Sequence, residues 1–182
     1  MKKREGGRWI VKSVRRGILY LVILAIPVAG LLYTAPRQAE RLLPGIEYRL
    51  GDAETGTAVN VRFEGSLQRR FFDAQRFRGT IIIGDKVLED VDVNLTQGGD
   101  LVMAKDPDTG ERYRFGVFYA VSGLEKITFT VLEPVVVFGV TTDEKYWSLE
   151  DGLMISAPAA NRSEALHVSN QLMGHLLEKP LE

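Results

Sequence analysis

Residues 57–65 read Thr-Ala-Val-Asn-Val-Arg-Phe-Glu-Gly, and every second side chain from Val59 onward is apolar. Val59, Val61 and Phe63 fall on one face of an extended chain, and polar residues alternate with them on the other face. A period of two is typical of a half-buried β-strand. The stretch therefore predicts a sheet with one apolar face, and the same pattern is repeated along the chain.

Further predicted strands follow at short intervals, separated by turn signals that each contain Gly, several of them together with Asp. The predicted strands lie at 77–83, 86–95, 100–104, 112–121, 126–132, 135–140, 146–149 and 153–156, with turns at 84–85, 97–99, 106–110, 122–123 and 150–152. These connections are too short for crossover helices, so neighbouring strands should be antiparallel. The expected fold is mainly β: an antiparallel meander of about eight or nine strands that forms a curved sheet, a sandwich or a barrel.

The pattern changes near the C-terminus, where Asn161 followed by Glu164 resembles the capping box of a helix. After it, apolar residues recur at helical spacing, and we predict an amphipathic helix over 162–177 that lies on the sheet and closes its core. The apolar side consists of Ala165, Leu166, Leu172, Met173 and Leu176.

Residues 17–36 form an uncharged, strongly apolar stretch of twenty residues. About 20 helical residues cross the roughly 30 Å hydrocarbon layer of a membrane, so the stretch predicts a transmembrane helix. Residues 1–16 contain seven basic side chains and one acidic side chain, which predicts that the N-terminus stays in the cytoplasm. The rest of the chain would then lie outside the cytoplasmic membrane, in the cell envelope.

A cleaved signal peptide is the alternative interpretation, and it would give a secreted protein. The cleavage signals are poor, because a Tyr33-Thr34-Ala35 site would place Tyr at −3 and Pro36 at +1. An uncleaved signal-anchor is therefore the preferred prediction. The expected organisation is a basic cytoplasmic tail at 1–16, an anchor at 17–36, a short helical stalk at 37–45 ended by Pro44-Gly45, and an extracytoplasmic domain at 46–182.

The composition of the outer region argues against several classes of function. Beyond residue 16 there are 16 basic and 23 acidic residues, a balance of −7, which disfavours binding to nucleic acid. The chain has no cysteine, which excludes disulfides, cysteine-ligated zinc and a thiol nucleophile. No cofactor is expected.

The segment from 69 to 78 contains four arginines and three phenylalanines, although the outer region is acidic overall. Such a patch could hold lipid headgroups, an anionic wall polymer or an acidic protein partner. A hairpin with buried Phe and solvated Arg is the structural alternative. The candidate surface residues are Arg69, Arg70, Phe71, Phe72, Arg76 and Arg78.

A second candidate is the segment that begins at the last residue of the final predicted strand, with Ser156, Pro158, Asn161 and Arg162 as a contact loop. A plain strand-to-helix connection with a helix cap explains the same residues. The histidines, His167 and His175, are about 80° apart on the predicted helix and two turns apart along it, too far to share a metal ion. We find no catalytic motif and predict no metal site.

Two stretches resemble small, single-pass, membrane-anchored extracytoplasmic proteins of spore-forming Gram-positive bacteria. These stretches are Phe71–Ile83 and Trp147–Ala159, the latter continuing through Asn161-Arg162 and Glu164–Leu166. That group has no assigned reaction, so the resemblance implies a topology and no mechanism.

The expected function is a non-catalytic binding or accessory domain with a protein partner in the envelope and an unknown small-molecule ligand, if any. A carrier that encloses an apolar or lipid-like ligand in a curved sheet is one alternative. An envelope enzyme of unrecognised type is another.

Overall fold

The computed structural model describes residues 20–21, 23–54, 56–106, 109–137 and 140–182. The chain divides into two compact units, with the boundary between Ala35 and Pro36. In the first unit, the described residues from 20 to 34 are helical. No helix of the described residues combines the length and the apolar character needed to cross a membrane. The predicted tail at 1–16, and positions 17–19 and 22 of the predicted anchor at 17–36, lie outside the described residues.

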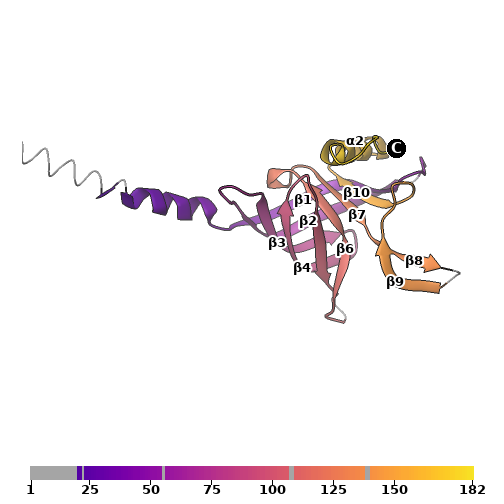
Figure 1. Cartoon of the computed structure of the whole chain (residues 1–182), viewed down its shortest axis with the longest axis horizontal. Helices are drawn as coiled ribbons and strands as arrows, with labels where there is room; N and C mark the ends of the chain where they lie inside the picture. Colours follow the sequence, from indigo (N-terminus) through magenta and orange to yellow (C-terminus); the bar gives the residue numbers. More distant parts are fainter. Residues whose placement is uncertain (1–19, 22, 55, 107–108, 138–139) are drawn as a thin grey trace, which may run out of the picture. The chain divides into compact units, whose positions relative to one another are not determined.

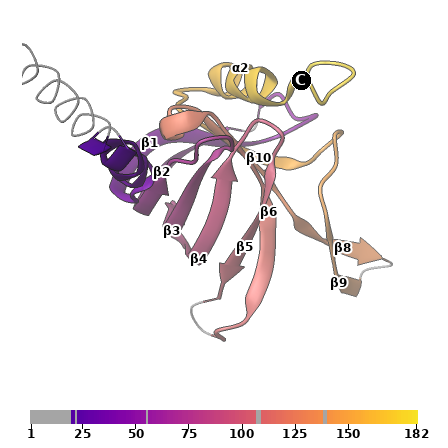
Figure 2. The same ribbon diagram turned by 60° about the vertical axis from the view of Figure 1, so that its left-hand side comes forward.

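The second unit is an eight-stranded antiparallel barrel with a helix on its outer face (Figures 1 and 2). Its strands are β1 (Arg37–Arg49), β2 (Thr57–Gln68), β3 (Gln75–Ile83), β4 (Lys86–Leu95), β5 (Asp100–Lys105), β6 (Arg112–Ala120), β7 (Ile127–Val131) and β10 (Leu153–Ala157). A short 3-10 helix, η1 (Ser122–Leu124), joins β6 to β7. The mainly β fold and the antiparallel pairing are as predicted.

The barrel closes because β10 lies between β7 and β1. Strands β1 to β7 follow one another as a meander, and β10 then pairs with β1 over Ile46–Arg49 and with β7 over Ile127–Thr130. The order around the barrel is β1-β10-β7-β6-β5-β4-β3-β2. This arrangement resolves the three architectures left open by the sequence in favour of a barrel.

After β7 the chain forms a separate two-stranded sheet outside the barrel, which is drawn at the lower right in Figure 1. Its strands are β8 (Glu133–Val137) and β9 (Val140–Tyr146). The predictions here were wrong in detail. The single strand predicted at 135–140 covers parts of two strands, and most of the strand predicted at 146–149 is a loop.

The predicted helical stalk at 37–45 was also wrong in conformation. These residues form the first part of β1, which pairs with β2 from Arg37↔Leu67 onward. The run Pro44-Gly45, which suggested the end of a helix, lies inside the strand. The first part of β1 pairs with β2 alone, and such an edge tolerates the missing N–H of Pro44.

Large side chains fill the interior of the barrel. Phe63, Phe77, Phe118 and Phe129 are fully buried there, and Phe118 and Phe129 pack with ring centroids 4.7 Å apart. An eight-stranded barrel is just wide enough for side chains to fill it. The interior is therefore a hydrophobic core.

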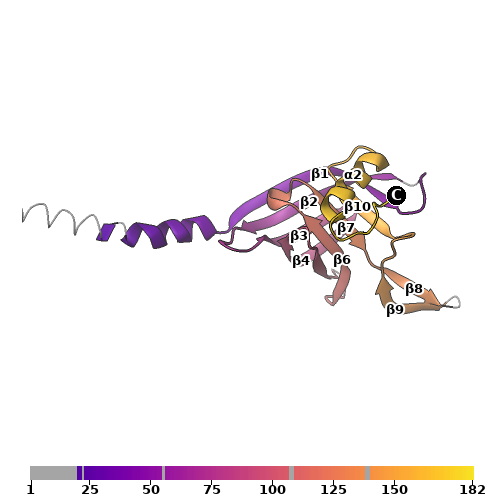
Figure 3. The same cartoon turned by 45° about the horizontal axis from the view of Figure 1, so that its top comes forward.

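The C-terminal helix α2 (Arg162–Met173) packs on the outside of the barrel over β1, β10 and β7 (Figure 3). It creates a second core of its own, in which Tyr48 and Met154 from the barrel meet Ala165, Val168 and Leu172 from the helix. The helix ends at Met173 and not at 177 as predicted. Leu176, which we placed on the packed side, is 51% exposed. The barrel closes by strand pairing, so the helix covers a wall and does not complete the interior.

Candidate functional site

The predicted arginine–phenylalanine surface spans the end of β2, the loop 69–74 and the start of β3. Phe77 points into the barrel and is fully buried, whereas Phe71 and Phe72 in the loop are 58% and 103% exposed. The structure therefore divides the three phenylalanines into one core residue and two surface residues. The two exposed rings lie 6.3 Å apart between their centroids.

Three of the arginines in this segment form ion pairs with carboxylates. Arg70 forms an ion pair of 2.6 Å with Asp73 across the loop. Arg76 and Arg78 both bind Asp92 on β4, Arg76 through two nitrogens and Arg78 at 2.9 Å. The hydrogen bonds from Arg76 are the main cause that holds the pKa of Asp92 below its usual range.

The second predicted surface, 156–162, separates into residues with different roles. Ser156 is fully buried on β10, so its proposed place in a contact loop was wrong. Pro158 is exposed. The side chain of Asn161 caps α2 by accepting the N–H of Glu164 at 3.0 Å, and Glu164 accepts the N–H of Ala160 at 2.8 Å. Arg162, the first residue of α2, lies with its guanidinium 5.7 Å from the ring centre of Tyr48.

Ser156 belongs to a buried cluster of hydroxyl groups between the barrel and α2, together with Tyr48, Thr128 and Ser169. Ser169 donates to the carbonyl oxygen of Ala165 at 3.0 Å, so its Oγ is left to accept from Tyr48 at 2.5 Å and from Ser156 at 2.7 Å. Thr128 lies 3.0 Å from Ser156, and because the proton of Ser156 is directed to Ser169, the proton of Thr128 is the one shared between them. Each of the four donors thus has an acceptor.

This cluster is structural in character. Burial is the largest influence on Tyr48 and raises the pKa of its phenol. A neutral, satisfied hydroxyl network without solvent access fixes the helix on the barrel, because each hydroxyl would be costly to bury alone. Sequence reasoning missed Tyr48 and Ser169, which alternation along β1 and the helical period place on the packed faces.

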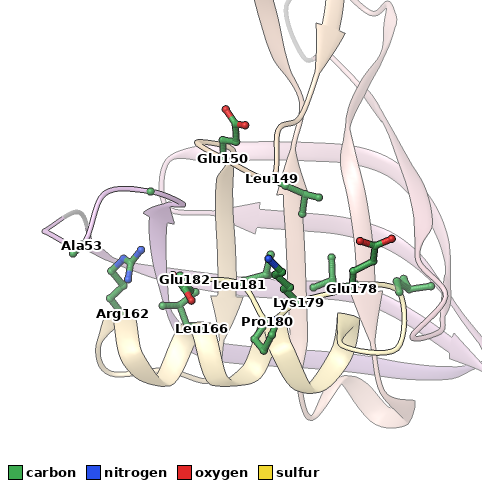
Figure 4. Close-up of a pocket in the computed structure, with 13 residues that line it drawn as sticks. Ala53, Leu149, Glu150, Arg162, Leu166, Glu178, Lys179, Pro180, Leu181 and Glu182 are labelled. Carbon is green, nitrogen blue, oxygen red and sulfur yellow. The ribbon is translucent and has the colours of Figure 1, made fainter.

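A surface recess of about 1040 Å³ lies beside the start of α2 (Figure 4). Its wall comes from the turn after β1, the loop before β10, the first turns of α2 and the C-terminal tail. Leu149 and Leu176 in this wall are 59% and 51% exposed. Arg162 and Lys179 supply positive charge, and Glu150 and Glu178 supply negative charge. Such a mixture suits a peptide or protein segment with both apolar and charged side chains.

The two histidines lie on the surface. His167 and His175 are both exposed, and His167 is hydrogen-bonded to Gln171 at 2.7 Å. Within the described part of the chain, no three His, Cys, Asp or Glu side chains gather as metal ligands would. Ser156 is sealed under α2, so it is not accessible to act as a nucleophile.

No protein-family model matches this chain, and neither a curated protein nor a solved structure does.

Proposed function

We propose that this chain is a membrane-anchored, extracytoplasmic binding or accessory domain that acts without catalysis. The anchor is supported by the sequence alone, through the uncharged stretch at 17–36 and the basic residues before it. The barrel serves as a rigid platform, and its loops and the recess beside α2 provide the binding surfaces.

The observation that carries the proposal is the recess with Leu149 and Leu176 in its wall. Large apolar side chains that gather in a surface hollow are typical of interaction sites. The barrel interior, in contrast, is filled by its own phenylalanines. Binding on the outside of the barrel is therefore better supported than enclosure of a ligand within it.

Site-specific photocrosslinking in native membranes tests this function. A benzophenone side chain at position 176 should give a discrete crosslinked product, because the recess would hold the partner there. The matched control is position 101, where Leu101 is 40% exposed on β5, away from the recess. Equal crosslinking at both positions, or none at 176, would contradict the proposal.

The carrier and enzyme alternatives make different predictions for the purified full-length protein. A lipid-like molecule recovered by organic extraction, in stoichiometric amount, would replace the proposal with a carrier function. Turnover of an envelope substrate by the purified protein would replace it with an enzymatic one.

A further inference from the structure

We propose that the loop between β2 and β3, residues 69–74, docks on the same lipid bilayer that holds the N-terminal anchor. This inference rests on the proposed membrane attachment and adds the lipid-contacting residues of the domain. Phe71 and Phe72 would enter the boundary between headgroups and acyl chains, and Arg69 and Arg70 would lie among the lipid phosphates.

The first step is the position of the loop in the barrel. Arg37, the first residue of β1, pairs with Leu67 near the end of β2. Figure 3 shows the start of β1 and the β2–β3 loop at the same end of the barrel. Phe71 follows Leu67 by four residues, so its Cα lies within roughly 20 Å of the Cα of Arg37.

The second step is the covalent connection. Only Ala35 and Pro36 separate Arg37 from residue 34, the last helical residue of the N-terminal unit. If the membrane-spanning segment ends at Pro36, Arg37 stands at the interface. The loop is then within reach of the membrane interface. Amphipathic helices that lie in this interface bury their apolar faces about 5–10 Å deep, and a comparable depth would admit the two phenylalanine rings.

The third step is the way the loop presents its phenylalanines. The ion pair between Arg70 and Asp73 encloses Phe71 and Phe72, and Asp73 also accepts the N–H of Ala74 at 2.8 Å. The loop is thereby closed at its base, and Phe72 is 103% exposed. Adjacent exposed aromatic rings at a loop tip are unfavourable in water and favourable at a membrane interface.

The fourth step is the distribution of charge along the barrel. The turns at the opposite end, 50–56, 84–85, 106–111 and 147–152, contain only acidic charged residues among those that the structure describes. They are Asp52, Glu54, Asp85, Asp106, Glu111, Glu150 and Asp151. The basic residues nearest to these turns, Arg49, Lys86, Lys105 and Arg112, lie in the flanking strands. The exposed turns of that end are therefore less attractive to an anionic bilayer than the loop end, which carries Arg37, Arg69 and Arg70.

The test uses the full-length protein in phosphatidylcholine vesicles with and without phosphatidylglycerol. Because the chain lacks cysteine, Phe72→Cys provides a single attachment point for an environment-sensitive dye. We expect blue-shifted emission and several-fold stronger quenching by doxyl-labelled lipid than for the control, Val87→Cys. Val87 is 37% exposed on β4 near the acidic end. The effect should increase with phosphatidylglycerol and decrease with added salt.

The first measurement replaces Phe72, one of the two residues proposed to enter the bilayer. A second measurement therefore attaches the dye outside the loop and keeps Phe72 in the reference protein. The dye is placed by Gln97→Cys in the neighbouring β4–β5 turn, and lipid quenching is compared with and without Phe71→Ser and Phe72→Ser. Loss of quenching supports docking. Unchanged quenching overturns the docking proposal. As a control, lipid quenching of the dye at position 97 is also compared with and without Leu101→Ser, which removes an exposed apolar side chain outside the loop.

Carbonate extraction of the same vesicles separates this inference from the proposed anchor. Protein that is released by carbonate would refute the anchor itself. Protein that resists carbonate but carries an aqueous dye at position 72 would refute docking alone. A dye shielded from iodide but not quenched by doxyl lipid would indicate a protein contact and would also refute docking.

Discussion

At the scale of single residues, the hydroxyl cluster determines how α2 is held. Ser169 is its centre, because its Oγ accepts from Tyr48 and Ser156 while its proton goes to the helix backbone. Removal of different hydroxyls from the cluster should therefore cost different amounts of stability. Loss of the Tyr48 hydroxyl leaves the other three donors satisfied. Loss of Ser169 removes the nearest acceptor of both Tyr48 and Ser156, and the next neighbours of the Tyr48 hydroxyl are farther away, Ser156 at 3.5 Å and the sulfur of Met154 at 3.7 Å.

Tyr48→Phe should therefore lower the free energy of unfolding by about 1 kcal/mol, the net value of one hydrogen bond. Ser169→Ala should cost more, about 1–3 kcal/mol, because the hydroxyls of Tyr48 and Ser156 both lose their nearest acceptor. Denaturant unfolding of the two variants checks the order. His167→Ala on the exposed side of the same helix is the control. A larger loss of stability for Tyr48→Phe than for Ser169→Ala would contradict the assigned hydrogen-bond directions.

Asp92 gives a second residue-scale prediction, which concerns pH. The pKa of Asp92 is lowered chiefly by hydrogen bonds from Arg76, so the folded state prefers the ionised carboxylate. This stabilisation is present above the pKa of an unfolded Asp and is lost as the pH falls through the lower folded-state pKa.

Asp92→Asn should destabilise the protein at neutral pH, by no more than about 1 kcal/mol because the pair is partly exposed and screened by salt. The difference from wild type should shrink as the pH falls below the usual range of Asp. Thermal unfolding across that range measures it, and a difference that stays constant with pH would show that the ion pairs are not its cause.

At the scale of elements, the closure of the barrel depends on a close approach between β1 and β10. A Cβ at Gly45 would lie 2.7 Å from the carbonyl oxygen of Ser156 and 2.9 Å from the Cβ of Ala157. Backbone cannot yield as a flexible side chain does, so a larger residue at this position forces the strands apart.

Gly45→Ala should destabilise the protein by about 1–3 kcal/mol, the usual cost of overpacking. Gly98→Ala in the β4–β5 turn is the matched control, because its Cβ would meet only the Oγ1 of Thr96 at an ordinary 3.5 Å. Chemical unfolding compares the two. Equal stabilities would mean that β10 moves away from β1 at little cost.

The cap of α2 gives a prediction for the helix. The Asn161 side chain accepts the N–H of Glu164, and the carboxylate of Glu164 accepts the N–H of Ala160. Asn161→Ala should reduce stability by about 1 kcal/mol. Asn161→Asp retains an accepting oxygen and should restore most of the loss, as measured by thermal unfolding; a loss as large as that of Asn161→Ala would contradict the capping role.

These elements show how far the sequence predicts the structure. Alternation identified most barrel strands and turns, and the Asn161–Glu164 spacing identified the start of α2. The first part of β1 was missed because Pro44 and Gly45 suggest a helix end when pairing is unknown. The roles of these two residues depend on which strand lies beside them, and that is a tertiary property.

The candidate surfaces were predicted less well than the fold. Composition located the segment 69–78 but could not separate buried Phe77 from exposed Phe72, since the loop interrupts the alternation. Ser156 was placed both at the end of a predicted strand and in a candidate contact loop. The pairing of β10 with β1 and β7 confirms the strand and buries Ser156, so the contact-loop prediction was wrong. The recess beside α2 involves segments from four parts of the chain, and no local pattern indicates their convergence.

At the scale of the whole molecule, two hydrophobic cores share one wall made of β1, β10 and β7. The inward side chains of this wall fill the barrel, and its outward side chains pack against α2. This explains why all five residues of β7 are buried. A strand covered on both faces loses the alternation that marks the rest of the sheet.

The proposed topology leads to a prediction for the intact cell. Single cysteines can be introduced without background because the chain contains none. Asp52→Cys, in the exposed turn after β1, should react with a membrane-impermeant maleimide in intact cells. Lys3→Cys should react only after permeabilisation. Labelling of both, or the reverse pattern, would contradict an N-terminus inside and a barrel outside.

The register of β1 against β2 has a mechanical consequence. The chain enters the barrel at the start of β1, and the two strands pair without interruption from Arg37↔Leu67 to Glu47↔Thr57. A pull on Pro36 against the far end of the barrel acts along this ladder, perpendicular to its hydrogen bonds. All the hydrogen-bonded pairs of the two strands then bear the load together and do not break one after another. Tension applied through Pro36, as the proposed anchor would apply it, therefore reaches the domain in the direction in which its strand pairing resists shear.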